Sequence, residues 1–538
     1  MTAVGPPPWA TRILPDDMVH LLGLAGAHAR APALKAFCAH EASHGPTYDG
    51  ALSCRQKVLP MSAVLHIEPP AEEAALRTAF ERLRAGFEAE RDPPLAVRLD
   101  RLQRLDAMLE AMAPAMIEAI SADFGHRPSQ VTRMADIVPV QLALRHTRKH
   151  LASWMKTRRM PTGLVHRPGH NRLMRQPLGV VGIVSPWNYP GMLALSPAIA
   201  ALAAGNRVMI KPSEIGPRFA ALLQAQVAGR FAPEEMAVLT GDADVGRRFV
   251  SLPFDHLLFT GSTAVGRQVA MAAAANLTPV TLELGGKSPA ILGAGCDLAA
   301  AVPKLVFGKL LNAGQTCIAP DYVAVPRAQL DAFVDGMRRE HARQYPTVAT
   351  NPDYTSIATE RHYRRLLALL DEARAAGARV LNLHDEGPSD ATRKLPLHLV
   401  LDAPAGLRVM QEEIFGPILP VLAYERIDEV IAHVNGGDRP LALYWFGSDA
   451  DERERVLRQT LAGGVTVNDT LMHISQEDLP FGGVGASGMG AYHGEWGFRA
   501  FSKETGVYYQ SAFSGVKLLY PPYGTTFERL LGLMRRLG

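Results

Sequence analysis

The sequence predicts an α/β protein with two doubly wound domains and a small additional β element. First, five apolar strand-like runs alternate with four helical segments between residues 180 and 283, and strands separated by crossover helices form parallel sheets. Second, the same alternation resumes after residue 284. Third, the chain of 538 residues is too long for one ordinary core of about 100–200 residues.

The composition is that of a globular protein and excludes several classes of function. Hydrophobic residues make up 47% and charged residues 20%, and the formal net charge is only +3. This balance gives no reason to expect nucleic acid or a membrane surface as a partner. No apolar stretch reaches the roughly 20 residues of a membrane helix. The four cysteines form neither a zinc pattern nor a disulfide framework, which favours reduced thiols in the cytoplasm.

The elements of the first sheet follow from the apolar runs and the helical periodicity between them. We expect strands at residues 180–184, 207–210, 237–239, 256–260 and 279–282. The crossover helices are expected at residues 192–204, 217–230, 244–250 and 264–275. Ligands of such sheets bind at the carboxyl ends of the strands, so the loops that follow these strands are the first places to look for a site.

The whole chain divides into five expected parts. Residues 1–60 lack periodicity and read as a poorly ordered or non-native extension; residues 61–160 and 178–283 form the first domain and residues 284–495 the second. Residues 161–177, interrupted by Pro168 and Gly169, predict a projecting hairpin that joins a late strand within 496–512 in an oligomerisation element. Residues 513–538 form a C-terminal tail with a short amphipathic helix.

Two residues carry the chemistry that the sequence points to most directly. Cys317 lies in Gly314-Gln315-Thr316-Cys317, and Glu283 lies 34 residues earlier in Glu283-Leu284-Gly285-Gly286. A soft nucleophile and a carboxylate are the groups needed to form a thioester and then hydrolyse it. An unperturbed thiol is mostly protonated at neutral pH, so the site must lower the pKa of Cys317 or supply a base.

Asn188 is the candidate for stabilising an oxyanion. It lies between Pro186 and Pro190, directly after the first strand. Its side-chain amide is a hydrogen-bond donor at the ligand-binding edge, and the flanking prolines restrict the backbone. A simple turn held by two prolines is the alternative. The presence of Cys317 favours the interpretation that Asn188 stabilises an oxyanion.

A dinucleotide cofactor has two candidate contact regions on this sheet. A strand ends and a helix begins at Gly261-Ser262, with Gly266 in the first helical turn, and such a helix start suits a pyrophosphate. The second region follows the second strand and comprises Lys211, Ser213 and Glu214. An acidic residue in that position can accept the ribose hydroxyls and repels a 2′-phosphate, so we expect NAD first, with NADP possible.

Taken together, these motifs resemble those of NAD(P)-dependent aldehyde dehydrogenases, in particular the class that includes coniferyl aldehyde dehydrogenase and the class 3 enzymes. The resemblance runs from about Met61 to the C-terminus and includes Glu412-Glu413-Ile414-Phe415-Gly416-Pro417 and Leu479-Pro480-Phe481-Gly482-Gly483. It implies that Cys317 attacks the aldehyde, Asn188 holds the oxyanion, and Glu283 activates water. It also implies cofactor-binding roles for Trp187, Glu413 and Phe415.

The expected substrate is a small aldehyde, aromatic or of medium chain length, with coniferyl aldehyde as an example. Tyr189 and Ile474, together with Leu471 and Met472, are the candidate apolar walls of its tunnel.

Two alternative functions remain open: transfer of the acyl group to coenzyme A, and a catalytically retired cofactor-binding protein. We expect a homodimer. We expect no metal, because the HExxH pattern at residues 40–44 lies in the extension and has no evident third ligand.

Overall fold

The computed structural model describes residues 71–537, which belong to one compact unit. The predictions for residues 1–60, including the HExxH pattern, lie outside the described residues. No helix within the described part of the chain is both long enough and apolar enough to cross a bilayer.

The first sheet has six strands in the order β15-β7-β6-β3-β4-β5. All neighbours pair in parallel except β15, which pairs antiparallel with β7 through Gly488 and Glu283. The strands are β3 (Val180–Ser185), β4 (Arg207–Pro212), β5 (Met236–Val238), β6 (His256–Thr260), β7 (Val280–Glu283) and β15 (Gly488–Met489). The five parallel strands lie where the apolar runs predicted them, within one or two residues at each end.

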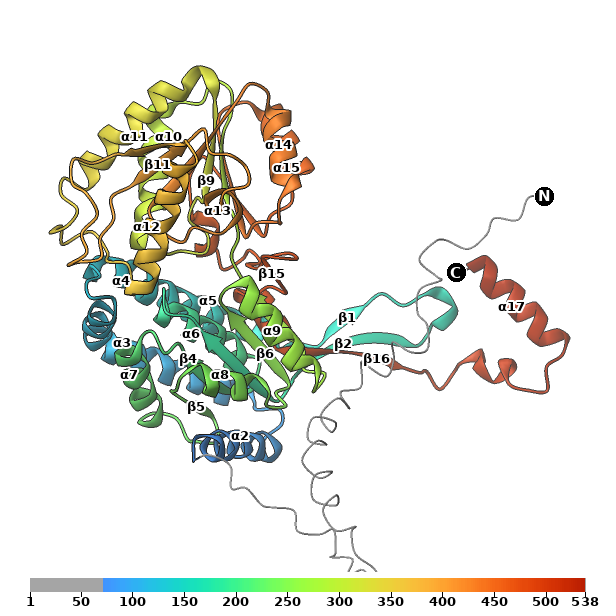
Figure 1. The fold of residues 1–538 in the computed structure, drawn as a ribbon. Helices are drawn as coiled ribbons and strands as arrows, with labels where there is room; N and C mark the ends of the chain where they lie inside the picture. The colour runs from blue at the N-terminus through green and yellow to red at the C-terminus, as the bar shows by residue number, and fades with distance from the viewer. Residues whose placement is uncertain (1–70, 538) are drawn as a thin grey trace, which may run out of the picture. The chain divides into compact units, whose positions relative to one another are not determined.

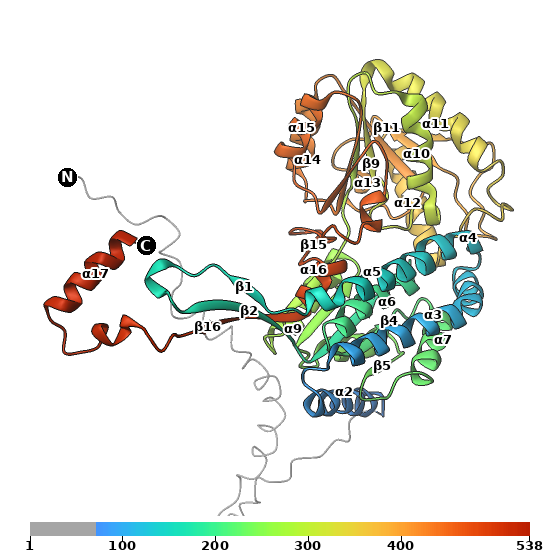
Figure 2. The same cartoon turned by 180° about the vertical axis from the view of Figure 1, so that it is seen from behind.

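Helices cover both faces of this sheet, as seen from opposite sides in Figure 1 and Figure 2. One face packs against α2 (Ala71–Ala89), α8 (Ala243–Val250) and α9 (Thr263–Ala274). The other face packs against α6 (Pro190–Ala203) and α7 (Pro217–Ala228). The first of these is covered in turn by α3 (Leu95–Phe124), α5 (Val138–Trp154) and α16 (Gly494–Ala500), and the second lies between β5 and α3. Every residue of α6 is buried, as expected for a helix that is apolar on all sides.

The second sheet has seven strands in the order β10-β11-β12-β9-β8-β13-β14, and all neighbours are parallel except β10 and β11. The strands are β8 (Pro289–Leu292), β9 (Tyr322–Pro326), β10 (Arg379–Asn382), β11 (His398–Leu401), β12 (Ile418–Tyr424), β13 (Ala442–Phe446) and β14 (Gly464–Val467). Its helices are α10 (Leu298–Leu310), α11 (Leu330–Gln344), α12 (Glu360–Ala375), α13 (Arg408–Gln411), α14 (Ile427–Gly436) and α15 (Ala450–Gln459). Two mainly parallel sheets with helices on their faces confirm the predicted α/β class.

One hydrophobic core runs through both sheets. Ile183 and Ile210 of the six-stranded sheet belong to the same cluster of buried side chains as Ala290 and Val323 of the seven-stranded sheet. Because this core is continuous, the loops at the carboxyl ends of the two sheets are held at fixed positions relative to each other. The site described below lies among these loops.

A third, antiparallel sheet has the order β1-β2-β16, with strands β1 (Arg158–Met160), β2 (His170–Pro177) and β16 (Ser502–Tyr509). The predicted hairpin and late strand are therefore paired with each other. Two segment limits differ from expectation: residues 494–500 are helical, and β15 joins the first sheet although it was placed in the second domain. The chain ends in α17 (Thr525–Leu537).

Candidate active site

Cys317 follows an unusual turn that ends α10. The helix stops at Leu310, and the next residues include Asn312 and Ala313 with φ of 54° and Gly314 with φ of 75°. Left-handed conformations cost on the order of 1 kcal/mol or more at each non-glycine residue and persist only where the surroundings enforce them. This turn redirects the chain so that Cys317 faces a cavity instead of continuing along the helix.

Gln315 enforces the turn from inside the protein. Its fully buried amide nitrogen donates to the carbonyls of Asn312 (3.0 Å) and Ser356 (3.1 Å), and its amide oxygen accepts from the N–H of Ala358 (2.9 Å). The sequence motif around Cys317 contains Gln315 but does not predict these bonds. A long polar side chain two residues before Cys317 was the available signal, because buried amides need partners.

Asn188 meets the Cys317 loop directly. It lies between β3 and α6, is 3% exposed, and donates from its side-chain amide to the carbonyl of Gln315 at 3.1 Å. Its own carbonyl accepts from Asn312 at 3.1 Å. Since an amide NH₂ carries two donors, one N–H of Asn188 remains for an oxygen atom beside Cys317. The structure thus brings Asn188 to the loop that carries Cys317, as the sequence predicted.

A buried ion pair, which sequence reasoning missed, holds the loop that carries Asn188. Arg127 donates to the carbonyl of Asn188 at 2.9 Å and to Asp136 at 2.7 Å. Asp136 accepts from the N–H groups of Gly191 (2.9 Å) and Met192 (3.2 Å) at the start of α6. Asp136 lies on a π-helical segment, Arg133–Ile137, a feature that is frequent at functional sites.

Glu283 ends β7 and is also buried at the site. It is 2% exposed, and neither carboxylate oxygen has a hydrogen-bond partner among the described residues. Burial raises the pKa of Glu283 well above its ordinary value. A carboxyl group in this environment is protonated more readily than in water, which is one way to prepare a general base or acid.

The thiol of Cys317 is influenced by the two acidic groups nearest to it. Burial, followed by the charges of Glu413 and Glu283, raises the pKa of Cys317 to about 12. A thiol that is to act at neutral pH needs either a lowered pKa or a base. Without a bound ligand the surroundings raise the pKa, because burial and negative neighbours both disfavour a thiolate; the base is therefore the option that remains.

An apolar cavity of about 170 Å³ opens beside Cys317. Its walls come from four parts of the chain and comprise Met134, Ala135, Pro139, Tyr189, Met192, Leu193, Phe307, Leu311, Thr316, Ile318, Leu471, Met472, Ile474 and Ser475. Tyr189, Leu471, Met472 and Ile474 were predicted as walls, and all four line it. The hydroxyl of Tyr189 lies 2.5 Å from that of Thr316, which leaves mainly carbon surface toward the cavity.

The carboxyl edge of the six-stranded sheet fits a dinucleotide. Two buried hydroxyls at the ends of adjacent strands, those of Ser185 and Thr260, have no partner among the described residues, so the edge offers hydrogen bonds to a ligand or water. Lys211 is 3% exposed and lies 3.3 Å from Glu214. Gly266, in the first turn of α9, has no space for a side chain, because an added Cβ would lie 2.6 Å from Leu284.

Three of the predicted cofactor residues engage neighbours instead of facing open space. The N–H of Gly261 donates to the carbonyl of Glu283 at 3.0 Å. The hydroxyl of Ser262 caps α9 by accepting from Val265 at 3.4 Å, and that of Ser213 accepts from Ile215 at 3.2 Å. These three groups shape the loops, and the remaining N–H groups at the start of α9 are the ones left for an anion.

Glu413 and Phe415 lie on a loop that is hydrogen-bonded to Asp321, a short distance along the chain from Cys317. Lys287 and Asp321 form an ion pair at 2.5 Å, and they also bond the loop at the Glu412 carbonyl and the Ile414 N–H. Burial raises the pKa of Glu413 to about 8. A Cβ added at Gly285 would lie 2.2 Å from the Glu413 carboxylate, so a side chain there would force that carboxylate to move.

Trp187 lies against this loop from the first sheet. Its ring is 5.6 Å from that of Phe415, edge to face, and is stacked on that of His362 at 5.0 Å. The two predicted cofactor residues Trp187 and Phe415 are thus neighbours. No group of three or more potential metal ligands lies within residues 71–537.

Comparison with known proteins places this geometry in a family. The model of the aldehyde dehydrogenase family matches residues 60–507. A Pseudomonas aeruginosa protein named "probable coniferyl aldehyde dehydrogenase" is 47% identical over 456 residues, which covers 85% of this chain and 95% of the relative.

Solved structures agree with this assignment. A substrate-bound Staphylococcus aureus AldH superposes with a TM-score of 0.81 at 34% identity, covering 85% of this chain and 99% of that one. A Mycobacterium tuberculosis aldehyde dehydrogenase complexed with NAD⁺ gives a TM-score of 0.72 at 27% identity, covering 81% and 90%.

Proposed function

Because the chain belongs to the aldehyde dehydrogenase family, we propose that it oxidises aldehydes to carboxylic acids with Cys317 as the nucleophile. The observation that carries this proposal is the position of Cys317. Its thiol lies at an apolar cavity, with the Asn188 amide on one side and the carboxyl group of Glu283 near enough to raise the thiol pKa.

In the first step, the sulfur of Cys317 bonds to the aldehyde carbon while the thiol proton passes to a base. The carbonyl oxygen becomes an oxyanion, which accepts hydrogen bonds from the Asn188 amide and the N–H of Cys317. Donors of this kind each contribute about 100-fold to 1000-fold in rate. The turn at Asn312 and Gln315 keeps these donors in place before the substrate arrives.

NAD(P)⁺ is the cofactor, and when bound its nicotinamide accepts the hydride and its positive charge favours the ionised forms of Cys317 and Glu283. Lys211 and Glu214 would hold the adenosine ribose, the start of α9 the pyrophosphate, and Glu413, Phe415 and Trp187 the nicotinamide half. The charge of Glu214 supports NAD over NADP, because a carboxylate repels a 2′-phosphate.

Loss of the hydride leaves an acyl thioester on Cys317. Glu283 then takes a proton from water as the water oxygen attacks the acyl carbon. The carbon–sulfur bond breaks to give the acid, and the departing sulfur takes the proton back from Glu283, which restores the thiol and the carboxylate. The buried carboxyl of Glu283 supports hydrolysis over transfer to coenzyme A. An assay with and without coenzyme A separates these two endings.

For the substrate class we propose an aromatic or medium-chain aldehyde. The cavity presents carbon surface from Tyr189, Leu471 and Ile474 and contains no charged wall residue, so an uncharged aldehyde gains by burial and a charged one is desolvated without a partner. The name of the P. aeruginosa relative adds coniferyl aldehyde as a candidate.

The test is NADH formation across coniferyl aldehyde, benzaldehyde, hexanal and succinic semialdehyde, together with Cys317→Ala. We expect the uncharged aldehydes to have the higher kcat/KM and the variant to be inactive. A preference for the semialdehyde would overturn the substrate class, and undiminished oxidation by Cys317→Ala would overturn the mechanism. The catalytically retired alternative predicts no NADH formation from any of the four.

We further propose a homodimer joined through the three-stranded sheet. Large apolar side chains are exposed on or beside its strands, among them Met160, Leu164, Tyr508 and Tyr509, and such patches favour association. Light scattering that finds only monomer would contradict this. A reducing cytoplasm suits the reaction, because a catalytic thiol has to remain reduced.

A further inference from the structure

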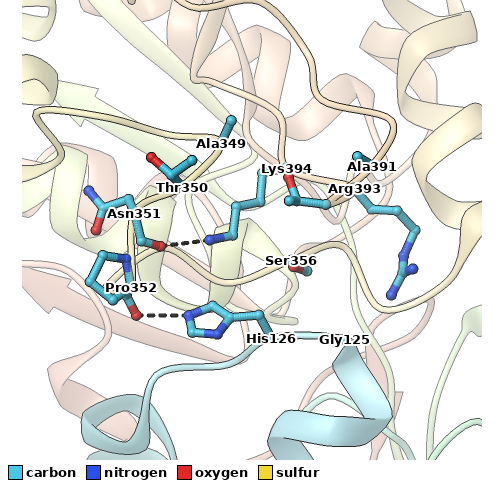
Figure 3. A pocket seen from close by; sticks show the side chains of 11 residues that line it. Gly125, His126, Ala349, Thr350, Asn351, Pro352, Ser356, Ala391, Arg393 and Lys394 are labelled. Atoms are coloured by element: carbon cyan, nitrogen blue, oxygen red, sulfur yellow. Dashed lines mark hydrogen bonds between the residues drawn. The ribbon is translucent and has the colours of Figure 1, made fainter.

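A second cavity, of about 400 Å³, lies away from Cys317 and shares no wall residue with the apolar cavity. It is formed where the turn after α3 meets two loops of the domain that contains the seven-stranded sheet, as Figure 3 shows. The walls come from the turn at Gly125 and His126, from residues 349–352 with Ser356, and from residues 391–394.

The charged groups of this cavity are all positive. Lys394 and Arg393 line it, and no aspartate or glutamate does. Lys394 is 3% exposed, and within residues 71–537 its ammonium has one partner, the carbonyl of Asn351 at 2.6 Å. Arg393 donates to the carbonyls of Ile357 and Phe124. Neither cation has a carboxylate within 4.0 Å among the described residues, so carbonyl dipoles are their only protein partners there.

This arrangement leaves hydrogen-bond donors free at the cavity. An ammonium group carries three N–H donors, and the Asn351 carbonyl uses one of those of Lys394. Ser356 is 1% exposed, and its hydroxyl makes no hydrogen bond to a described residue. Burial lowers the pKa of Lys394, and no neighbouring carboxylate opposes the effect. A buried cation without a counter-charge is costly, and a bound anion removes that cost.

We propose that this cavity is a binding site for a small oxyanion of the phosphate or carboxylate type. The ammonium of Lys394 supplies the charge, and the hydroxyl of Ser356 supplies a directed hydrogen bond, a combination that is stronger than bonds between neutral groups. The guanidinium of Arg393 adds positive potential while it holds the C-terminal end of α3 through Phe124.

An occupant of this cavity touches a segment that also reaches the catalytic turn. Ser356 lines the cavity, and its carbonyl accepts from the side-chain amide of Gln315 at 3.1 Å. The carbonyl of Gln315 in turn accepts from Asn188. The site is therefore two hydrogen bonds from the Asn188 side chain, although binding itself does not depend on this connection.

The experiment measures binding of inorganic phosphate, sulfate and succinate by titration calorimetry, with chloride at equal ionic strength as the salt control. Saturating NAD⁺ is present so that the helix start proposed for the pyrophosphate is occupied; a parallel titration without NAD⁺ separates a failure of that assignment from a failure of this one. We expect one phosphate or one dicarboxylate per chain, with a higher melting temperature, because a ligand bound only by the folded state stabilises it.

Three variants locate the anion. Lys394→Met removes the charge and keeps the stem, so affinity is expected to fall by about 10-fold to 100-fold. Ser356→Ala removes one donor, with an expected loss of about 3-fold to 10-fold. Lys304→Met is the matched control, because Lys304 also donates to a carbonyl, that of Asn468 at 2.7 Å, outside the cavity; its affinity is expected to match that of the unmodified protein.

Absence of binding beyond the chloride control would overturn the proposal. So would equal affinity in all four proteins, or a loss in Lys304→Met as large as that in Lys394→Met. If Lys394→Met fails to fold, Ser356→Ala decides the question, since it removes a single hydroxyl and leaves both cations in place. Preference for phosphate over succinate, or the reverse, identifies which oxyanion the site takes.

Discussion

The guanidinium of Arg127 lies 2.7 Å from the carboxylate of Asp136, and both side chains are entirely buried. Arg127 also bonds the carbonyl of Asn188, and Asp136 bonds the N–H groups that follow it at Gly191 and Met192. The pair thus holds the Asn188 loop on both sides. The guanidinium of Arg127 also lies 5.0 Å from the ring centre of Tyr189. The pair therefore supports the wall of the apolar cavity as well.

Removing this pair is expected to slow turnover more than it weakens cofactor binding. In Arg127→Leu/Asp136→Asn no charge is left unpaired and the acceptor for Gly191 is kept, but the charged bond to Asn188 is lost. Such bonds contribute about 1.5–3 kcal/mol, so kcat should fall by about 10-fold to 100-fold while KM for NAD⁺ stays the same. Steady-state kinetics measures both constants.

The single variant Arg127→Leu separates stability from positioning. It leaves Asp136 buried and unpaired, which typically costs about 3–5 kcal/mol of unfolding free energy, whereas the double variant is expected to recover much of this. Arg84→Leu removes the more exposed ion pair with Asp255 and serves as a control with unchanged kcat. Wild-type kcat in the double variant would show that Asn188 needs no such support.

Glu283→Gln is expected to reduce about one NAD⁺ per active site and then stall, because water activation is lost while hydride transfer is kept. Rapid-mixing absorbance detects the burst, and mass spectrometry detects the acyl group on Cys317. Glu477→Gln is a suitable control, since burial also raises the pKa of Glu477, to about 7, and it has no proposed role. Steady turnover by Glu283→Gln would assign water activation to another group.

The five parallel strands of the six-stranded sheet could be predicted because each of them is a local signal, whereas β15, a two-residue strand of Gly488 and Met489, gives none. The run His256–Thr260 is fully buried, reads as apolar in the sequence, and is bounded by turns. Val180–Ser185 is likewise apolar, and all of its residues except Val184 are buried. Candidate residues such as Cys317, Glu283 and Asn188 were found for a related reason: each follows an element whose end could be located, and chemistry collects at strand ends in these folds.

The contacts that hold those residues could not be predicted, because they join distant parts of the chain. Arg127 meets Asn188 across 61 positions, and Gln315 meets Ser356 across 41. No local pattern records which loop a buried polar side chain will satisfy. The orientation of Ser213 and Ser262 was missed for the opposite reason, since their hydroxyls bond backbone groups two or three residues away, a competition that short polar side chains often win.

Glu214→Gln is expected to improve the use of NADP⁺. The Glu214 side chain is 48% exposed beside Lys211, so its charge is partly screened but still opposes a 2′-phosphate. Removing it should raise kcat/KM for NADP⁺ by about 5-fold to 10-fold and change that for NAD⁺ much less. Asp451→Asn, on α15 of the other lobe, controls for net charge. An unchanged ratio of the two cofactors would separate Glu214 from the ribose.

Met472→Lys is expected to change which aldehydes are accepted. Met472 is 43% exposed and lines the apolar cavity, so an unbranched lysine can replace it without disturbing the core. The new charge should raise kcat/KM for succinic semialdehyde by about 10-fold and lower that for hexanal. Met472→Leu keeps the apolar wall and the original order. If Met472→Lys leaves the order of the four aldehydes unchanged, this wall does not contact the substrate.

In the absence of cofactor, the rate at which iodoacetamide alkylates Cys317 should report the raised pKa values of both Cys317 and Glu413. With a thiol pKa of about 12, the thiolate fraction and hence the alkylation rate should rise about 10-fold per pH unit from about pH 7. Glu413, whose pKa is about 8, ionises as the pH passes that value, and its charge then disfavours the thiolate. The rate should therefore climb less steeply while Glu413 ionises, around pH 8, and Glu413→Gln should remove this bend. Peptide mass spectrometry distinguishes Cys317 from Cys296. A plateau below about pH 8 would mean that the thiol is ionised before the cofactor arrives.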